Sequence, residues 1–371
     1  MAENSEAMNT VGQSSRNTNT ESAVASLTNE SRRNFLKIAG VAGAVGLAGC
    51  SGGTDGGATG SSGSSTTTVT MTGSGSFSLG TAQAMQRALR QESDSVELNV
   101  TEVSGNPASV QEYNRGNAAS YSTENFTIVS ARDGQPPFQS EQGIAPQGLV
   151  NMLFHYYWMG VDGSGLETTD DLLEQDVNVW MFPAAWGSRR VQEVIYQNAD
   201  QWETIQDKVV NLEAGEVAGA IEEGRVDAFF GQGATYEGIP GWATEIDARH
   251  DVHVLETSDS LVDGIDSMPS IGTEEIEPYG WEQDVGTETV TAWNNGVQFC
   301  FGSDISDEAV YEICRVSHEH PDVLREAMPQ YMDHSEPANM IENLLSGVPV
   351  HNGAADFLEE MGVWDDSMER A

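Results

Sequence analysis

The chain has very few basic residues. Its 371 residues include 16 lysines and arginines against 58 aspartates and glutamates, which gives a net charge of −42 at pH 7. A protein that binds nucleic acid, or that binds an anionic membrane surface through charge, needs a basic patch to neutralise phosphates. The sequence has no such patch, so we expect neither nucleic acid nor an anionic surface as a partner of the folded part.

Cysteine is scarce as well. Besides Cys50, the chain has only Cys300 and Cys314. Outside the cell these two thiols could form a disulfide. Cys300 ends an apolar strand pattern, and Cys314 lies on a predicted helix between Ile313 and Val316. Two buried free thiols are the commoner outcome for residues in such positions.

The seven histidines form no recognisable metal site. His318 and His320 are two residues apart, which places them on different faces of a helix. No nucleophile elbow, zinc-protease motif or paired-cysteine zinc pattern occurs, and the glycine-rich loop at 73–80 lacks the lysine of a P-loop. We therefore expect no metal, no cofactor and no catalytic residue.

The segment that ends at Cys50 has the pattern of an export signal. A twin-arginine pair, Arg32 and Arg33, precedes an uncharged run that is too short and too glycine-rich to span a bilayer. The run closes on Leu-Ala-Gly before Cys50, which resembles a lipobox. This pattern predicts removal of residues 1–49, acylation of Cys50 and anchoring to the outer face of the cytoplasmic membrane. Residues 50–66, almost all Gly, Ser and Thr, are expected to form a flexible tether.

Strands alternate with helices along the rest of the chain, which predicts an α/β fold with parallel sheets covered on both faces. No later apolar run approaches membrane length, so we expect any transmembrane step to belong to a partner. Strands are expected at 69–72, 96–100, 177–182, 226–230, 252–255, 289–293 and 296–301.

Two loops of small residues, each between a strand and a helix, are the candidate binding elements. They lie at Gly73–Gly80 and Pro183–Ser188. Such loops expose unpaired backbone N–H groups and the positive end of a helix dipole, which favour an anion such as a carboxylate. The pair Arg189–Arg190 could place a guanidinium over an anionic ligand or remain a solvated pair. Phe77 and Trp186 could line the site or cover the core.

Four further stretches carry a resemblance to a known family. They are Thr72–Ser76 before a helix, Glu222–Phe230 with its Asp-Ala-Phe-Phe strand, Asp307–Tyr311, and Val348–Ala354. In this order, behind a lipoprotein signal, they resemble the TAXI family of extracytoplasmic solute receptors, in a haloarchaeal-type lipoprotein form. These receptors are the substrate-capturing subunits of TRAP transporters.

The resemblance implies a type II periplasmic-binding-protein-like fold, with a ligand cleft and a hinge between two α/β lobes. Lobe 1 would comprise 67–156 plus 293–371, and lobe 2 would comprise 157–292 with the hinge crossings. The implied function is capture of a small anionic or zwitterionic solute, which carries a carboxylate, and its delivery to a TRAP-type permease. The residues expected in the cleft are Ser74, Ser76, Phe77, Thr123, Asn125, Trp186, Gly187, Ser188 and Arg189.

The sequence departs from the family pattern at two places that touch these residues. Phe77–Ser78 stands where the family usually has tyrosines, and Thr123–Asn125 stands where it commonly has Gln-x-Asp. A ligand-sensing or scaffolding lipoprotein with the same fold is the alternative function. A secreted hydrolase is a further class, but no pair of nucleophile and base is evident for it. Asn99 and Asn125 also stand in glycosylation sequons and are candidate acceptors.

The excess of acidic residues indicates a protein adapted to a hypersaline medium. Lowering the salt from about 1 M to about 0.01 M lengthens the Debye screening length from roughly 3 Å to 30 Å, which exposes the carboxylates to their mutual repulsion. We therefore expect the midpoint of thermal unfolding of the mature domain to fall steeply over this range. Circular dichroism at pH 7 measures it, and a midpoint independent of salt would contradict the prediction.

Overall fold

The computed structural model describes residues 66–184 and 186–371. The predicted export signal with Arg32 and Arg33, the lipidation site Cys50 and tether residues 50–65 lie outside the described residues. The strands are β1 (Thr67–Ser74), β2 (Val96–Val103), β3 (Ser120–Glu124), β4 (Gln147–Val161), β5 (Val179–Trp180), β6 (Ala228–Ala234), β7 (Val252–Val254), β8 (Gly272–Ile276) and β9 (Val290–Phe301).

Helices connect most of these strands. The α-helices are α1 (Ser78–Glu92), α2 (Asn106–Asn114), α3 (Asn125–Arg132), α4 (Asp171–Glu174), α5 (Gly187–Asn198), α6 (Trp202–Ile205), α7 (Val217–Glu222), α8 (Gly241–Asp247), α9 (Asp259–Asp266), α10 (Asp307–Glu319), α11 (Pro321–Ala327) and α12 (Asn352–Glu360). The short 3₁₀ helices are η1 (Gln206–Lys208), η2 (Ala214–Glu216) and η3 (Pro337–Met340).

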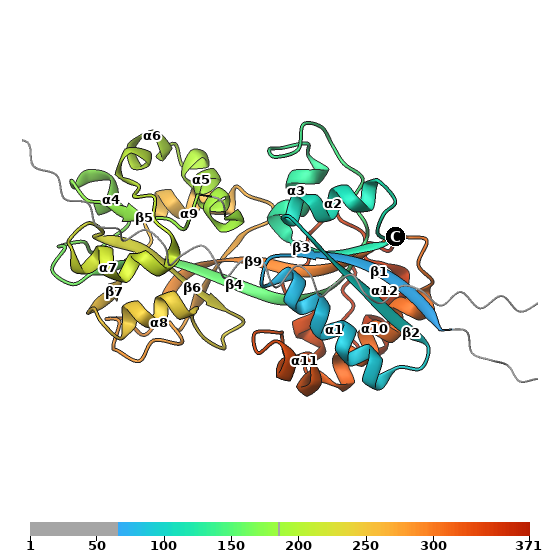
Figure 1. Ribbon diagram of the computed structural model, residues 1–371. Helices are drawn as coiled ribbons and strands as arrows, with labels where there is room; N and C mark the ends of the chain where they lie inside the picture. The colour runs from blue at the N-terminus through green and yellow to red at the C-terminus, as the bar shows by residue number, and fades with distance from the viewer. Residues whose placement is uncertain (1–65, 185) are drawn as a thin grey trace, which may run out of the picture. The chain divides into compact units, whose positions relative to one another are not determined.

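The described strands form one mixed sheet with the order β2-β1-β3-β9-β4-β6-β5, to which β7 adds on β4 and β8 on β9. The pairs β1–β2, β1–β3 and β5–β6 are parallel, whereas β4 and β9 run antiparallel to their neighbours. The predicted α/β class is confirmed, but the expectation of purely parallel sheets is wrong. The chain runs out along β4 and returns along β9, so these two strands must be antiparallel (Figure 1).

β4 is the strand around which the sheet is built. It is 15 residues long, and every residue except Val161 is buried, as expected for a strand covered on both faces. Its first part pairs with β9, up to the pair Tyr156–Trp293, and its last part pairs with β6. Around it the described side chains form two large apolar clusters. One is centred on Trp158, Trp180, Phe230 and Trp293, and the other on Leu89, Phe299, Ile313 and Phe357.

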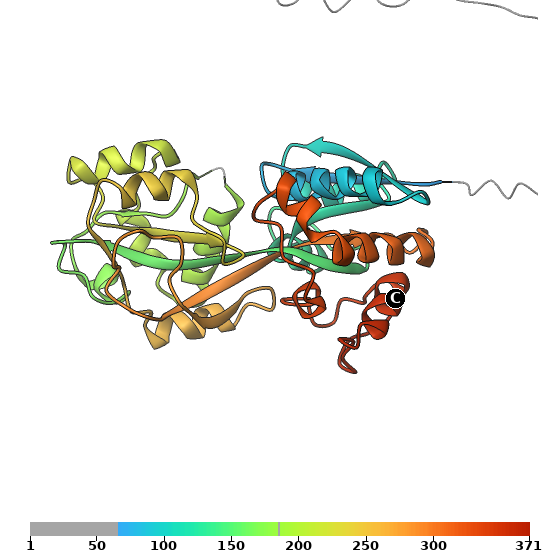
Figure 2. The same cartoon turned by 90° about the horizontal axis from the view of Figure 1, so that it is seen from below.

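The stretch Val348–Ala354 has a structural explanation. His351 caps α12, because its Nδ1 accepts a hydrogen bond from the Gly353 backbone N–H at 3.2 Å. Helix α12 packs beside α10 (Figure 2). A Cβ atom on Gly353 would lie 2.0 Å from the backbone oxygen of Asp307, so only glycine permits this approach.

The described residues also bear on the cysteines, on metal-binding groups and on membrane-spanning helices. Cys300 and Cys314 are free, buried thiols, and burial raises the pKa of both, that of Cys314 to about 12. Within residues 66–184 and 186–371, no group of three or more His, Cys, Asp and Glu side chains is arranged to hold a metal ion. The same residues contain no helix that is both long and apolar enough to cross a membrane.

The close packing at Gly353 predicts a large effect of a single methyl group. Gly353→Ala should lower the free energy of unfolding by about 1–3 kcal/mol, because α12 must move away from α10. Gly219→Ala in α7 is the matched control. Nothing lies within 4 Å of the added Cβ atom there, so alanine should be neutral or stabilising. Denaturant unfolding in molar salt measures both, and an unchanged stability of the Gly353 variant would contradict the expected clash.

His334 predicts a loss of stability in acid. Its Nε2 donates to Val150 O at 2.7 Å and its Nδ1 accepts from Ser317 Oγ at 2.8 Å. Burial lowers the pKa of His334 from 6.5 to about 4. Below pH 6.5 the unfolded chain therefore binds a proton that the folded chain excludes, and the free energy of unfolding falls as the pH falls.

Between pH 7 and pH 5 the contribution of His334 is roughly 2 kcal/mol. His334→Gln keeps a donor and an acceptor but cannot titrate. We expect its free energy of unfolding to depend less steeply on pH over this range than that of the wild type, by urea titration in molar salt. Equal slopes would show that the folded protein accepts the proton on His334 without penalty.

Candidate functional site

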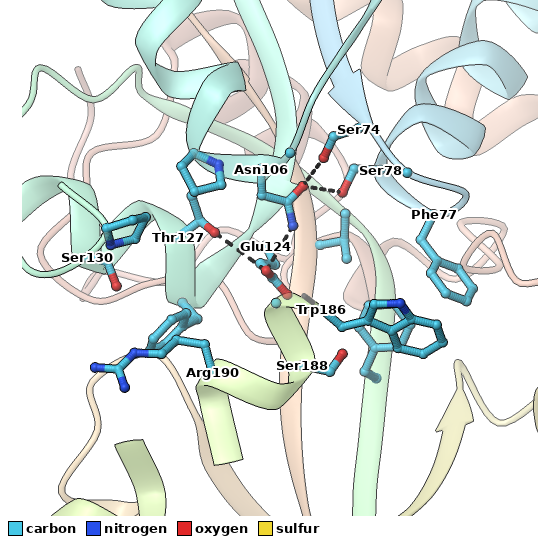
Figure 3. A pocket seen from close by; sticks show the side chains of 18 of the residues that line it. Ser74, Phe77, Ser78, Asn106, Glu124, Thr127, Ser130, Trp186, Ser188 and Arg190 are labelled. Atoms are coloured by element: carbon cyan, nitrogen blue, oxygen red, sulfur yellow. Dashed lines mark hydrogen bonds between the residues drawn. The ribbon is translucent and has the colours of Figure 1, made fainter. Parts of the chain in front are cut away.

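A cavity of about 760 Å³ is the main candidate site (Figure 3). Four helices begin at its wall, because lining residues lie at or beside the first residues of α1, α2, α3 and α5. The N-terminal backbone N–H groups and positive dipole ends of these helices therefore surround the same space, and one of these groups, the Phe126 N–H of α3, already donates to Asn295 Oδ1 at 3.3 Å. Strands β4, β6 and β9 add Phe154, Gln232 and Val297 to the wall.

The two small-residue loops singled out in the sequence meet at this cavity. The first follows β1, and the second leads into α5. Each loop thus delivers the start of one helix to the cavity wall. The expected cleft residues that line the cavity are Ser74, Ser76, Phe77, Trp186, Gly187 and Ser188.

Three expected residues lie outside the cavity lining. Thr123 is fully buried in β3. Asn125 is also buried; its Nδ2 donates to Asn343 Oδ1 at 2.7 Å and its Oδ1 accepts from Gln298 Nε2 at 2.7 Å. The bond from Gln298 ties α3 to β9, the bond to Asn343 ties it to the segment after η3, and a buried amide so engaged is not available as a glycan acceptor. Asn99, the other sequon, is exposed.

Arg189 is the third residue outside the lining. It is buried and pairs with Glu193, with Nε 3.0 Å from Oε1. Arg190 lines the cavity instead. Helix periodicity explains why Arg190 lines the cavity in place of Arg189. Arg190 lies three residues after Gly187 and therefore shares its face of α5, whereas Arg189 does not.

Glu124, at the end of β3, is the most buried charged residue among the cavity residues that the sequence-based prediction missed. It is only 5% exposed. Its Oε1 accepts from Asn106 Nδ2 at 2.8 Å, and its Oε2 accepts from Asn295 Nδ2 at 2.9 Å. Thr127 Oγ1 lies 3.5 Å from Oε1. Burial raises the pKa of Glu124, and the three hydrogen bonds oppose that rise.

Asn106 connects Glu124 to the first loop. Its Oδ1 accepts from Ser74 Oγ at 2.6 Å and from Ser78 Oγ at 3.2 Å, while its Nδ2 faces Glu124 (Figure 3). The second loop approaches the same carboxylate. A Cβ atom on Gly187 would lie 2.7 Å from Glu124 Oε1, so the glycine allows α5 to begin close to Glu124.

Aromatic side chains form much of the remaining wall. Phe77 packs edge-on against Phe154, with ring centroids 4.9 Å apart. Trp186 is 39% exposed and stacks on Phe182 at 6.2 Å. In Figure 3, Phe77 and Trp186 lie on one side of Glu124, and Arg190 lies on the other. The cavity therefore has a polar centre, one apolar side and one basic edge.

Comparison with known proteins identifies a family. The NMT1-like family matches residues 67–362. No curated protein matches the chain. Similar solved structures include MatC from Rhodopseudomonas palustris with bound malate, which is 12% identical over 81% of this chain and 99% of that one, with a TM-score of 0.45.

Two further similar structures are sulfonate-binding proteins. The periplasmic aliphatic sulphonate binding protein SsuA from Escherichia coli is 13% identical over 82% of this chain and 96% of that one, with a TM-score of 0.40. The alkanesulfonate-binding protein SsuA from Xanthomonas axonopodis pv. citri, bound to MOPS, is 10% identical over 81% and 95%, with a TM-score of 0.35. At these identities and TM-scores the similarity carries no argument about the ligand of this chain.

Proposed function

This chain belongs to the NMT1-like family, and we propose that it is an extracytoplasmic solute-binding receptor without catalytic activity. In this proposal the solute occupies the cavity between the loop after β1 and the start of α5. The chain is exported through the twin-arginine signal and held at the outer face of the membrane by lipid on Cys50. It is a TAXI-type receptor of a hypersaline organism that delivers its solute to a TRAP-type permease.

The convergence of four helix N-termini on one cavity is the observation that carries this proposal. Free backbone N–H groups and positive dipole ends bind a carboxylate without a cationic side chain. Arg190 is the basic side chain among the described lining residues and stands at the edge of the cavity. A carboxylate-bearing solute, such as an amino acid or an organic acid, is therefore the ligand we propose.

The lining residues also support a binding role over a catalytic one. Ser74 Oγ donates to Asn106, and Ser188 Oγ lies 3.2 Å from Tyr156 OH. Neither hydroxyl has a histidine or carboxylate hydrogen-bonded to it in the described part of the chain. Nucleophilic catalysis by serine requires such a base in contact with the hydroxyl.

We propose that the solute is held by closure of two lobes. Residues 67–156 with 293–371 form one lobe, and 157–292 form the other, with β4 and β9 as the hinge connection. The lining supports this division, because the loop after β1 belongs to one lobe and the start of α5 to the other. A solute that contacts both loops would favour the closed state by its differential affinity.

Thermal unfolding of the mature domain in molar salt tests the receptor function. The additives are amino acids, dicarboxylates and 2-oxo acids, each in a separate sample. A ligand at 100 times its Kd adds about 2.7 kcal/mol to the free energy of unfolding, which raises the midpoint by several degrees. A shift confined to one chemical class is the expected result. No shift with any class, from a sample that unfolds cooperatively, would contradict the receptor function.

A bulky residue at the start of α5 should block the site. Ser188→Trp is expected to abolish binding of whichever solute raises the midpoint, because the indole fills space beside Gly187, while the unliganded midpoint stays near that of the wild type. Ser303→Trp is the control. Ser303 is exposed and follows β9, whose last residue, Phe301, pairs with the first residue of β3, whereas Glu124 is the last residue of β3. Retained affinity in the Ser188 variant would remove this loop from the site.

A further inference from the structure

Glu124 is a buried carboxylate held entirely by hydrogen-bond donors. The orientations of the two amides that contact it are set by their other partners. Asn106 Oδ1 already accepts from Ser74 and Ser78. Asn295 Oδ1 accepts from the Phe126 backbone N–H at 3.3 Å. Neither amide can turn its oxygen toward Glu124 without losing these bonds.

A proton on Glu124 would therefore find no acceptor at its two short contacts. Protonation of either oxygen would make that oxygen a poorer acceptor and would remove the charge that strengthens both bonds, at 2.8 and 2.9 Å. The two amides thus favour the ionised carboxylate, against burial, which raises the pKa of Glu124. The site is built around a negative charge.

In the described part of the chain, no side chain of opposite charge pairs with this carboxylate. Among residues 66–184 and 186–371, no Lys, Arg or His nitrogen lies within 4.0 Å of Glu124. Arg190, the basic residue of the lining, pairs with Glu193, with NH1 3.2 Å from Oε2. Buried charges in proteins are normally paired, because an unpaired charge loses its hydration without compensation. The helix ends at α3 and α5 supply only partial charges.

The cavity beside Glu124 also has a large apolar part. Phe77, Phe154 and Trp186 form one wall, and Val297 adds to it. An adjoining hollow of about 330 Å³ shares Phe126, Ser130, Pro136 and Arg190 with the cavity. A small dicarboxylate would leave these aromatic walls without a partner, whereas an aliphatic or aromatic side chain would cover them.

We propose that the solute is a zwitterionic amino acid with a large apolar side chain, whose ammonium group donates hydrogen bonds to Glu124. Its carboxylate binds at the N-termini of α1 and α5, and its side chain packs against Phe77, Phe154 and Trp186. The inference rests on the proposed receptor function and narrows it to one class of solute. It assigns Glu124 as the residue that distinguishes amino acids from other organic acids.

Matched ligands test this assignment on the wild-type mature domain. Calorimetric titration in molar salt at pH 7 compares phenylalanine with 3-phenylpropanoate and leucine with 4-methylpentanoate. Each pair differs only in the amino group. We expect the amino acid of at least one pair to bind about 10- to 100-fold more tightly, the range for a hydrogen bond to a charged group. Malate and succinate should bind more weakly than that amino acid.

The outcomes separate this inference from the receptor function. Equal affinities within each pair, or tight binding of the dicarboxylates alone, would overturn the amino-acid assignment and leave the receptor function standing. Failure of all these compounds to bind, together with failure of the 2-oxo acids of the thermal-unfolding series, would overturn both the amino-acid assignment and the receptor function. The comparison requires no variant, so it does not depend on how a substitution affects folding.

Glu124→Gln assigns the effect to this residue. The amide keeps the shape of the side chain but removes the charge, and its NH2 group meets the Nδ2 of Asn106 or Asn295, a cost that both ligands of a pair share. Affinity for the amino acid should therefore fall about 10- to 100-fold further than affinity for its partner without the amino group. Glu102→Gln, which removes a charge from an exposed position of β2, should change neither. An equal loss for both ligands would show that Glu124 only supports the architecture of the site.

Discussion

The antiparallel pairing of β4 with β9 is the constraint on which the described part of the chain depends. β4 pairs with β9 along its first part and with β6 along its last. It is the strand that joins β9 to β6, since these two strands share no other neighbour in the sheet. β3 pairs with β9 and ends at Glu124, and β6 pairs with β5, which leads toward α5. The close approach of Gly187 to Glu124 at the cavity wall is therefore set through β4 and β9. Burial of nearly every β4 side chain stabilises that arrangement.

The cavity concentrates positive partial charge in a strongly acidic protein. Four helices begin at its wall, and their N-termini act over distances of a few ångströms. The many surface carboxylates lie farther away, and at molar salt a screening length of about 3 Å removes most of their influence. Local dipoles and Glu124, with its two amide partners, therefore decide what the cavity attracts. A net charge of −42 is compatible with binding a carboxylate there.

Local patterns located the two small-residue loops at the cavity but not every residue that lines it. Loops of small residues before helices are readable because exposed N–H groups follow from the strand-to-helix change itself. The face of a residue is harder to predict near the end of an element. Thr123 and Asn125 flank Glu124, and successive residues at a strand end point to opposite sides, so both expected residues lie outside the lining. The same one-residue shift separates Arg189 from Arg190 on α5.

The α/β class, the acidic character and the positions of the two loops follow from composition and periodicity, because burial and backbone geometry repeat over a few residues. Three other features do not follow from composition and periodicity. They are the direction of β9, the contact of Asn295 with Glu124 and the approach of Gly353 to Asp307. Asn295 and Glu124 are 171 positions apart, and they meet only because β3 pairs with β9 in one register. Register is a property of strands packed together, and a single chain read in order contains no local signal for it.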